Sequence, residues 1–222
     1  DLHSFPTRRS SDLSSSKRGS GKSTLAMNLT EYLRLQARTL YIDTDDDKQN
    51  FEWVALHRTG FGFEHISLKD HPDELMRRVE QVKTQYDDIV IDIDGHDSYA
   101  LRSVLMRADK LIIPMSAEAE EQEMYSQMLQ LAISVAQFNT QLKVYGILMR
   151  VPQQIEISQI EANQNLLKGI PGAHFLNTII YEDEAFGDAK NLGCSIWEHS
   201  PAQGQRFDQF IQELMADTAQ PV

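Results

Sequence analysis

The chain has 222 residues, of which 41% are hydrophobic and 24% are charged, and its formal net charge is −12. These values are typical of a globular protein with one buried core, and no apolar run is long enough to cross a membrane. The negative charge repels nucleic acid, so any contact with DNA must come from a local basic patch. The single cysteine, Cys194, excludes internal disulfides and predicts a reducing, cytoplasmic location.

The first residues, DLHSFPTRRSSDL, contain a proline and two arginines and show neither an apolar run nor an alternating pattern. They therefore do not predict a strand. In full, they match the translation of a common short-read sequencing adapter, so we expect residues 1–13 to be an adapter-derived artefact. Residues 14–222 are then expected to form a single domain whose first strand is truncated or replaced. The alternative is a native disordered or targeting arm.

The next segment, SKRGSGKST at residues 16–24, has the chemistry of a phosphate-binding loop. Its glycines let successive backbone N–H groups point into one concavity, Lys22 adds a positive charge, and Ser23 supplies a hydroxyl for Mg²⁺. Apolar residues then recur at helical spacing, so the loop is expected to lead into a helix whose N-terminus favours phosphate. The alternative, an ordinary glycine turn, does not account for this combination.

Strands and helices alternate along the rest of the chain. The expected strands are residues 39–43, 65–68, 88–92, 110–115, 143–149 and 174–180. The expected helices are residues 24–37, 72–86, 98–108, 120–137, 155–167 and 205–216. Several strands are continuous apolar runs, as strands covered on both faces are. This order predicts an α/β fold with a doubly wound, mainly parallel sheet and a site at the carboxyl ends of the strands.

Two acidic segments follow strands of the predicted sheet. Asp92 ends the apolar strand DIVID, so we expect its carboxylate beside the phosphates, where it holds Mg²⁺ directly or through water. The alternative is an aspartate that only makes a turn at the strand end. The segment DTDDD, residues 43–47, also leaves a strand end, and one of its carboxylates could orient an attacking water.

The segments SKRGSGKST, IDTDDDKQNFEW, YDDIVIDIDGHDS and ADKLIIP follow one another in this order. Together they resemble the ParA/MinD family of deviant Walker-A P-loop ATPases, and most of all its short plasmid-partition ParA proteins. The resemblance runs from about residue 15 to the final helix. It implies a P-loop NTPase that binds ATP and Mg²⁺, hydrolyses ATP slowly and forms an ATP-dependent sandwich homodimer. It also implies non-specific binding to nucleoid DNA and a centromere-binding, ParB/ParG-like partner that stimulates hydrolysis.

The resemblance assigns roles to individual residues. Lys17 matches the signature lysine that reaches the partner's phosphates, Lys22 the P-loop lysine, and Ser23 the Mg²⁺ ligand. Asp92 matches the Walker-B aspartate, and Asp45 the aspartate that helps to activate water. The loop residues expected to contact the nucleotide are Lys17, Arg18, Gly19, Ser20, Gly21, Lys22, Ser23 and Thr24.

Four residues match the family pattern weakly or depart from it. Arg150 follows the strand ending ILM, in a region that often lines the adenine pocket of the family. Arg18 stands where the family has glycine, and a long cation there either crowds the sandwich or adds a phosphate contact. Asp46 and Asp47 replace the Pro and Gln of the DxDPQ segment, which predicts a more mobile loop with a stronger attraction for Mg²⁺. The alternative is that these two carboxylates are simply solvated.

Two other functions are compatible with the sequence. A MinD-like ATPase that cycles on membranes would need a basic amphipathic helix at the C-terminus, but the tail FDQFIQELMADTAQPV is acidic, so we expect no membrane partner. A degenerate nucleotide-binding module with little turnover is suggested by Arg18 and the altered DxDPQ segment. Candidate DNA contacts in the C-terminal half are Lys168, Lys190 and Arg206, although isolated cations are usually only solvated.

Overall fold

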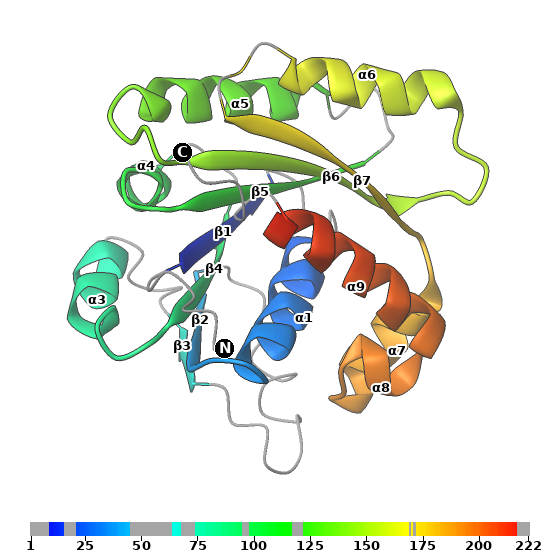
Figure 1. The fold of residues 1–222 in the computed structure, drawn as a ribbon, viewed down its shortest axis with the longest axis horizontal. Helices are drawn as coiled ribbons and strands as arrows, with labels where there is room; N and C mark the ends of the chain where they lie inside the picture. The colour runs from blue at the N-terminus through cyan, green and yellow to red at the C-terminus, as the bar shows by residue number, and fades with distance from the viewer. Residues whose placement is uncertain are drawn as a thin grey trace.

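The computed structural model describes residues 9–15, 21–44, 64–67, 74–94, 98–116, 122–168, 170 and 172–216. The strands in these ranges form one sheet in the order β3-β2-β4-β1-β5-β6-β7, and every pairing is parallel (Figure 1). Their bounds are β1 Arg9–Ser15, β2 Thr39–Asp43, β3 Glu64–Ser67, β4 Asp88–Asp94, β5 Lys110–Met115, β6 Lys143–Val151 and β7 Ala173–Tyr181. The predicted parallel α/β fold is confirmed.

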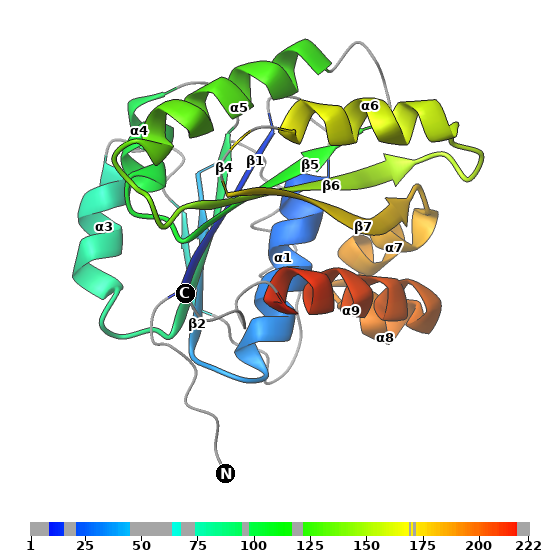
Figure 2. The same cartoon turned by 45° about the horizontal axis from the view of Figure 1, so that its top comes forward.

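Helices cover both faces of this sheet, and Figures 1 and 2 show the same division from two angles. One face carries α3 Leu75–Val82, α4 Tyr99–Leu105, α5 Gln122–Ala136 and α6 Ile157–Leu167. The other carries α1 Lys22–Arg34, α7 Glu184–Leu192, α8 Ile196–His199 and α9 Pro201–Ala216. Side chains of β4 alternate between the two cores, with Ile89 and Ile91 in the first and Val90 in the second. Because both faces are buried, the strands read as the apolar runs seen in the sequence.

Strand β1 corrects the expectation that the N-terminal segment forms no strand. Its backbone lies in the middle of the sheet and pairs with β4 over Arg9–Ser15 and with β5 over Ser11–Leu13. A parallel ladder is made by backbone groups, so neighbouring strands can hold a polar sequence in this position. The adapter origin of residues 1–13 and the domain over residues 14–222 stay predictions.

The helices near the C-terminus also differ from expectation, because α7 and α8 lie where no helix was predicted. Helix α7 begins after Asp183, whose carboxylate accepts a hydrogen bond from the Ala185 N–H, and ends at Gly193 in the left-handed region. Helix α8 has a capping box made by Ser195 and Glu198. Capping residues of this kind can be recognised in a sequence, but these two helices are too short to show a clear helical periodicity. None of the helices within the described ranges is both long and apolar enough to span a bilayer.

Candidate functional site

The carboxyl ends of the central strands meet at one edge of the sheet, and this edge holds the candidate site. In the strand register Asp92 of β4 pairs with Asp43 of β2 on one side and with Leu13 of β1 on the other. Helix α1 follows β1 in the chain and packs against β1, β2 and β4. Because these strands are parallel, the carboxyl ends of β1, β2 and β4 lie at the same edge.

Gly21 shapes the entry to α1. Its φ is +91°, a left-handed conformation, and its carbonyl accepts a hydrogen bond from the Leu25 N–H at 2.8 Å. A Cβ at this position would lie 3.1 Å from Cε of Met149, at the carboxyl end of β6. Glycine avoids both the strained backbone and this close contact. The backbone of Gly21 therefore lies close to the Met149 side chain.

The first turn of α1 offers backbone N–H groups to an anion. In the described part of the chain the helix has no side-chain cap, and its first turn contains no acidic residue. The side chain of Lys22, the first residue of the helix, is only 6% exposed, and Ser23 and Thr24 are half-buried. An uncapped N-terminus with a lysine and two hydroxyls has the donor chemistry that phosphate requires.

Asp92 is fully buried at the end of β4. Its Oδ2 accepts a hydrogen bond from the Tyr41 hydroxyl at 3.1 Å. Its backbone carbonyl accepts hydrogen bonds from both the N–H and the Oγ1 of Thr44, at 3.0 and 3.1 Å. The chain leaving β2 is thus tied to β4 beside the carboxylate. Asp43, paired with Asp92 in the register, is also buried.

These residues fit a magnesium–nucleotide complex. Buried carboxylates are stabilised by a nearby cation, and Mg²⁺ is usually held by one or two protein oxygens while phosphates and waters complete its octahedron. Among the described residues no group of three His, Cys, Asp or Glu side chains could form a metal cage by itself. The donor set of Ser23 and Asp92 therefore suits a metal that arrives with a phosphate ligand.

Arg150 lies at the same edge, directly after Met149. It is the only non-glycine residue with positive φ in the described ranges, at 54°, and it falls at an irregularity in the pairing of β6 with β7. Its guanidinium forms an ion pair with Glu182 at 3.1 Å, and both side chains are more than half exposed. Strained backbone of this kind occurs often at ligand sites. The ion pair, however, directs the arginine toward the end of β7.

Several predicted site residues, Lys17, Arg18, Gly19, Ser20 and Asp45, lie outside the described residues, as do Asp46 and Asp47. The structure places Gly21 directly before α1, Lys22, Ser23 and Thr24 in the first turn of that helix, and Asp92 in β4; their roles in binding stay predictions. The contacts of Tyr41, Thr44 and Met149 were not foreseen. Tyr41 and Thr44 belong to or follow an expected strand, so their proximity to Asp92 could have been found by aligning parallel strands. The contact between Met149 and Gly21 has no signal in the sequence.

The cations suggested as DNA contacts are in different situations. Arg206 donates a hydrogen bond to the Ile179 carbonyl at 3.2 Å, and its guanidinium lies 4.6 Å from the ring centre of Tyr181. It therefore contributes to the packing of α9 on β7. Lys168 is exposed at the end of α6, and Lys190 is half-buried in α7. Among the described residues, no contact places these three cations together in one basic patch.

Comparisons with known proteins agree with this fold. The family model described as the CobQ/CobB/MinD/ParA nucleotide binding domain matches residues 13–196. A comparison with curated protein sequences gives no match. Among solved structures, apo McdA from Cyanothece has a TM-score of 0.73 at 17% identity, covering 93% of this chain and 99% of that one.

Two further solved structures represent other branches of this fold. A ParA family ATPase from Chlorobium tepidum has a TM-score of 0.67 at 17% identity, covering 92% of this chain and 98% of that one. MinD from Pyrococcus horikoshii, solved with Mg-ADP, has a TM-score of 0.64 at 18% identity, covering 95% and 97%. At these identities the likeness is one of fold.

Proposed function

The chain belongs to the CobQ/CobB/MinD/ParA nucleotide-binding family, and from this premise we propose that it is a partition ATPase of a plasmid or other replicon. ATPases of the ParA/MinD branch hydrolyse ATP. The observation that supports nucleotide binding most strongly is the meeting of three features at one sheet edge. These are the left-handed Gly21, the uncapped start of α1 and the buried carboxylate of Asp92.

The proposed chemistry is mainly one of positioning. The N–H groups at the start of α1 hold phosphate oxygens, and Lys22 places a positive charge against them. Ser23 and Asp92 would hold Mg²⁺, and the bound ion would supply positive charge against the phosphoryl group. The hydrogen bond from Tyr41 keeps the Asp92 carboxylate in one orientation. The bonds from Thr44 keep the chain after β2, which leads to Asp45, close to that carboxylate.

The remaining roles rest on the resemblance to short ParA proteins. We propose that Lys17 reaches the phosphates of the partner in an ATP-dependent homodimer and that Asp45 orients the attacking water. Arg18 lies in the same loop and adds a donor to phosphate or limits dimer closure. Arg150 contributes to the edge of the base pocket, beside Met149. The partner would be a centromere-binding, ParB/ParG-like protein, and the ATP-bound dimer would bind nucleoid DNA without sequence preference.

The experiment that tests partition is a DNA-binding titration with ATP, with ADP and across a salt series. We expect binding only with ATP and a steep loss of affinity as salt rises, because phosphate contacts release counterions. Liposomes serve as the matched alternative surface. Binding to liposomes without binding to DNA would instead support a MinD-like, membrane-cycling ATPase. ATP binding without hydrolysis that a partner can stimulate would support an interaction module.

A further inference from the structure

Asn28, in the second turn of α1, connects the candidate phosphate site to α8 through the two ends of its side-chain amide. Its Nδ2 donates a hydrogen bond to the Thr24 carbonyl at 2.8 Å. Its Oδ1 accepts a hydrogen bond from the Ile196 N–H at 3.0 Å, although the two residues are 168 positions apart in the sequence. The side chain is buried. We propose that Asn28 is a positioning residue that couples nucleotide binding to the ordering of α8.

The start of α8 requires an acceptor from outside the helix. Its capping box satisfies the backbone N–H groups of Ser195 and Glu198. The N–H of Ile196, the first residue of the helix, has no acceptor in its own turn. Ile196 is fully buried, so water cannot take that place, and a buried N–H without an acceptor is unfavourable. The amide oxygen of Asn28 is the acceptor that holds the start of α8.

The other end of the amide lies beside the proposed nucleotide site, and the inference rests on that proposed function. Thr24 belongs to the first turn of α1, whose N–H groups would hold phosphate oxygens. A change in this turn on phosphate binding moves the Thr24 carbonyl to which Asn28 is bonded. Since Asn28 is bonded at both ends, its amide cannot follow one partner without changing its bond to the other. The phosphate site and α8 therefore respond to each other.

Trp197 extends this connection from α8 to α9. Its ring centre lies 6.1 Å from that of Tyr32 in α1 and 5.3 Å from that of Phe207 in α9. Its Nε1 donates a hydrogen bond to Oδ1 of Asp208 at 2.9 Å. A Cβ on Gly204 would lie 2.8 Å from Cδ1 of the tryptophan, so α8 and α9 are closely packed. Figures 1 and 2 show α7, α8 and α9 together on the face that α1 covers. A change at α8 therefore reaches the C-terminal helices.

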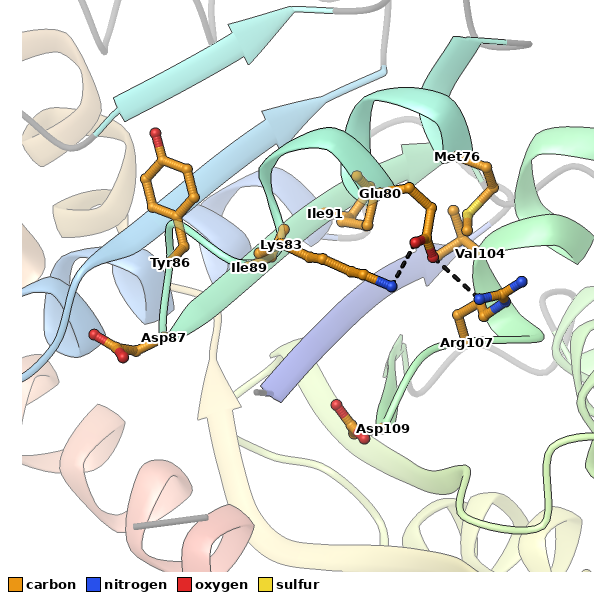
Figure 3. A pocket seen from close by; sticks show the side chains of 11 residues that line it. Met76, Glu80, Lys83, Tyr86, Asp87, Ile89, Ile91, Val104, Arg107 and Asp109 are labelled. Carbon is orange, nitrogen blue, oxygen red and sulfur yellow. Dashed lines mark hydrogen bonds and ion pairs between the residues drawn. The ribbon is translucent and has the colours of Figure 1, made fainter. Parts of the chain in front are cut away.

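The opposite face of the sheet provides a control. Glu80 of α3 forms ion pairs with Lys83 and, at 3.1 Å, with Arg107, beside a cavity of about 240 Å³ (Figure 3). These side chains are a third or more exposed, and exposed ion pairs contribute little to stability. The core under α3 is distinct from the core that contains α1. The amide of Lys83, bonded to the Val79 carbonyl at 2.8 Å, therefore reports effects that do not pass through Asn28.

Amide hydrogen exchange, followed by NMR on the full chain with and without saturating Mg-ATP, tests the coupling directly. We expect Mg-ATP to slow exchange at Ile196 by about fivefold or more and to leave Lys83 unchanged, because coupled sites stabilise each other. Calorimetry on the same sample measures ATP binding. ATP binding without slower exchange at Ile196, or with equal slowing at Lys83, would overturn the coupling and leave the proposed nucleotide site intact. An absence of ATP binding would overturn both.

Asn28→Leu removes both hydrogen bonds at similar side-chain size. The matched control is Asn163→Leu in α6, since Asn163 is also fully buried and its Nδ2 donates to the Gln159 carbonyl at 2.9 Å. Within the described ranges its Oδ1 has no hydrogen-bond partner, so it connects α6 to no second element in this way. Asn28→Leu should bind ATP about fivefold or more weakly and lose the slowing at Ile196 at saturating ATP, and Asn163→Leu should keep both.

The ratio of exchange rates with and without ATP separates coupling from a structural role. If Asn28 only supports the fold, Asn28→Leu raises exchange at Ile196 equally in both conditions and keeps the ratio of the unsubstituted chain. That result, or loss of the ratio in Asn163→Leu as well, would overturn the proposal. The comparison on the unsubstituted chain stays decisive if Asn28→Leu does not fold.

Discussion

Gly21 has the most distinctive backbone conformation of the described residues in the candidate nucleotide site. Alanine at this position would have to adopt a φ of +91° with its Cβ 3.1 Å from Met149. We expect Gly21→Ala to lower the free energy of unfolding by about 1–2 kcal/mol and to weaken ATP binding, because the loop must shift. Thermal unfolding and nucleotide titration measure the two effects.

The control for this substitution is Gly187→Ala in α7, where an added Cβ meets nothing within 4 Å. Alanine is the better helix former, so this variant should gain roughly 0.5–1 kcal/mol and bind ATP normally. Equal stability changes in the two alanine variants would show that the left-handed conformation at Gly21 is not required.

Cys194 offers a second test at the residue scale. Burial, and to a smaller extent the charge of Glu198, raise the pKa of its thiol above the ordinary value. A raised pKa means less thiolate at a given pH, so alkylation by iodoacetamide should be slower than that of free cysteine at pH values near 8. Glu198→Gln removes the nearby charge and should increase the rate. Reaction as fast as that of free cysteine would contradict this environment.

Lys110 connects β5 to the C-terminal helix. Its side chain is 3% exposed, its Nζ donates a hydrogen bond to the Leu214 carbonyl at 3.0 Å, and it lies 5.7 Å from the ring centre of Tyr145. Lys110→Met should lower stability by about 1–3 kcal/mol, because a buried carbonyl at the end of α9 loses its donor. Exposed Lys168→Met should have no measurable effect. If the two variants unfold at the same denaturant concentration, α9 is not anchored in this way.

The difference between prediction and structure follows from the range of the interactions. Strands with apolar runs, such as β2, were predicted with correct bounds. A strand that is buried on both faces consists mainly of apolar residues, and this pattern is visible in the sequence. The strand β1 was not predicted because its position depends on backbone pairing with β4 and β5, which its own residues do not indicate. The place of Asp92 in a strand and the start of α1 after the glycine-containing loop could both be predicted from local motifs. The contact of Met149 with Gly21 depends on how β6 is placed beside the loop, which no local pattern encodes.

At the scale of the whole molecule, a parallel sheet gathers the groups of the candidate site at the carboxyl ends of its strands. The chain's net charge of −12 is unfavourable for DNA, and Arg206 is engaged in packing α9 on β7. DNA binding by the proposed partition ATPase therefore calls for a local basic patch that outweighs the net charge.

We propose above all that the edge formed by Gly21, Lys22, Ser23 and Asp92 binds Mg-ATP. Calorimetric titration of ATP into the chain, with Mg²⁺ and with EDTA, tests it most directly. We predict saturable binding that is weakened by EDTA, and a loss of roughly tenfold or more in affinity for Lys22→Ala, since a charge-assisted contact to phosphate is removed. Lys168→Ala should bind as the unsubstituted chain does. An absence of ATP binding, or equal affinity in Lys22→Ala, would contradict the account.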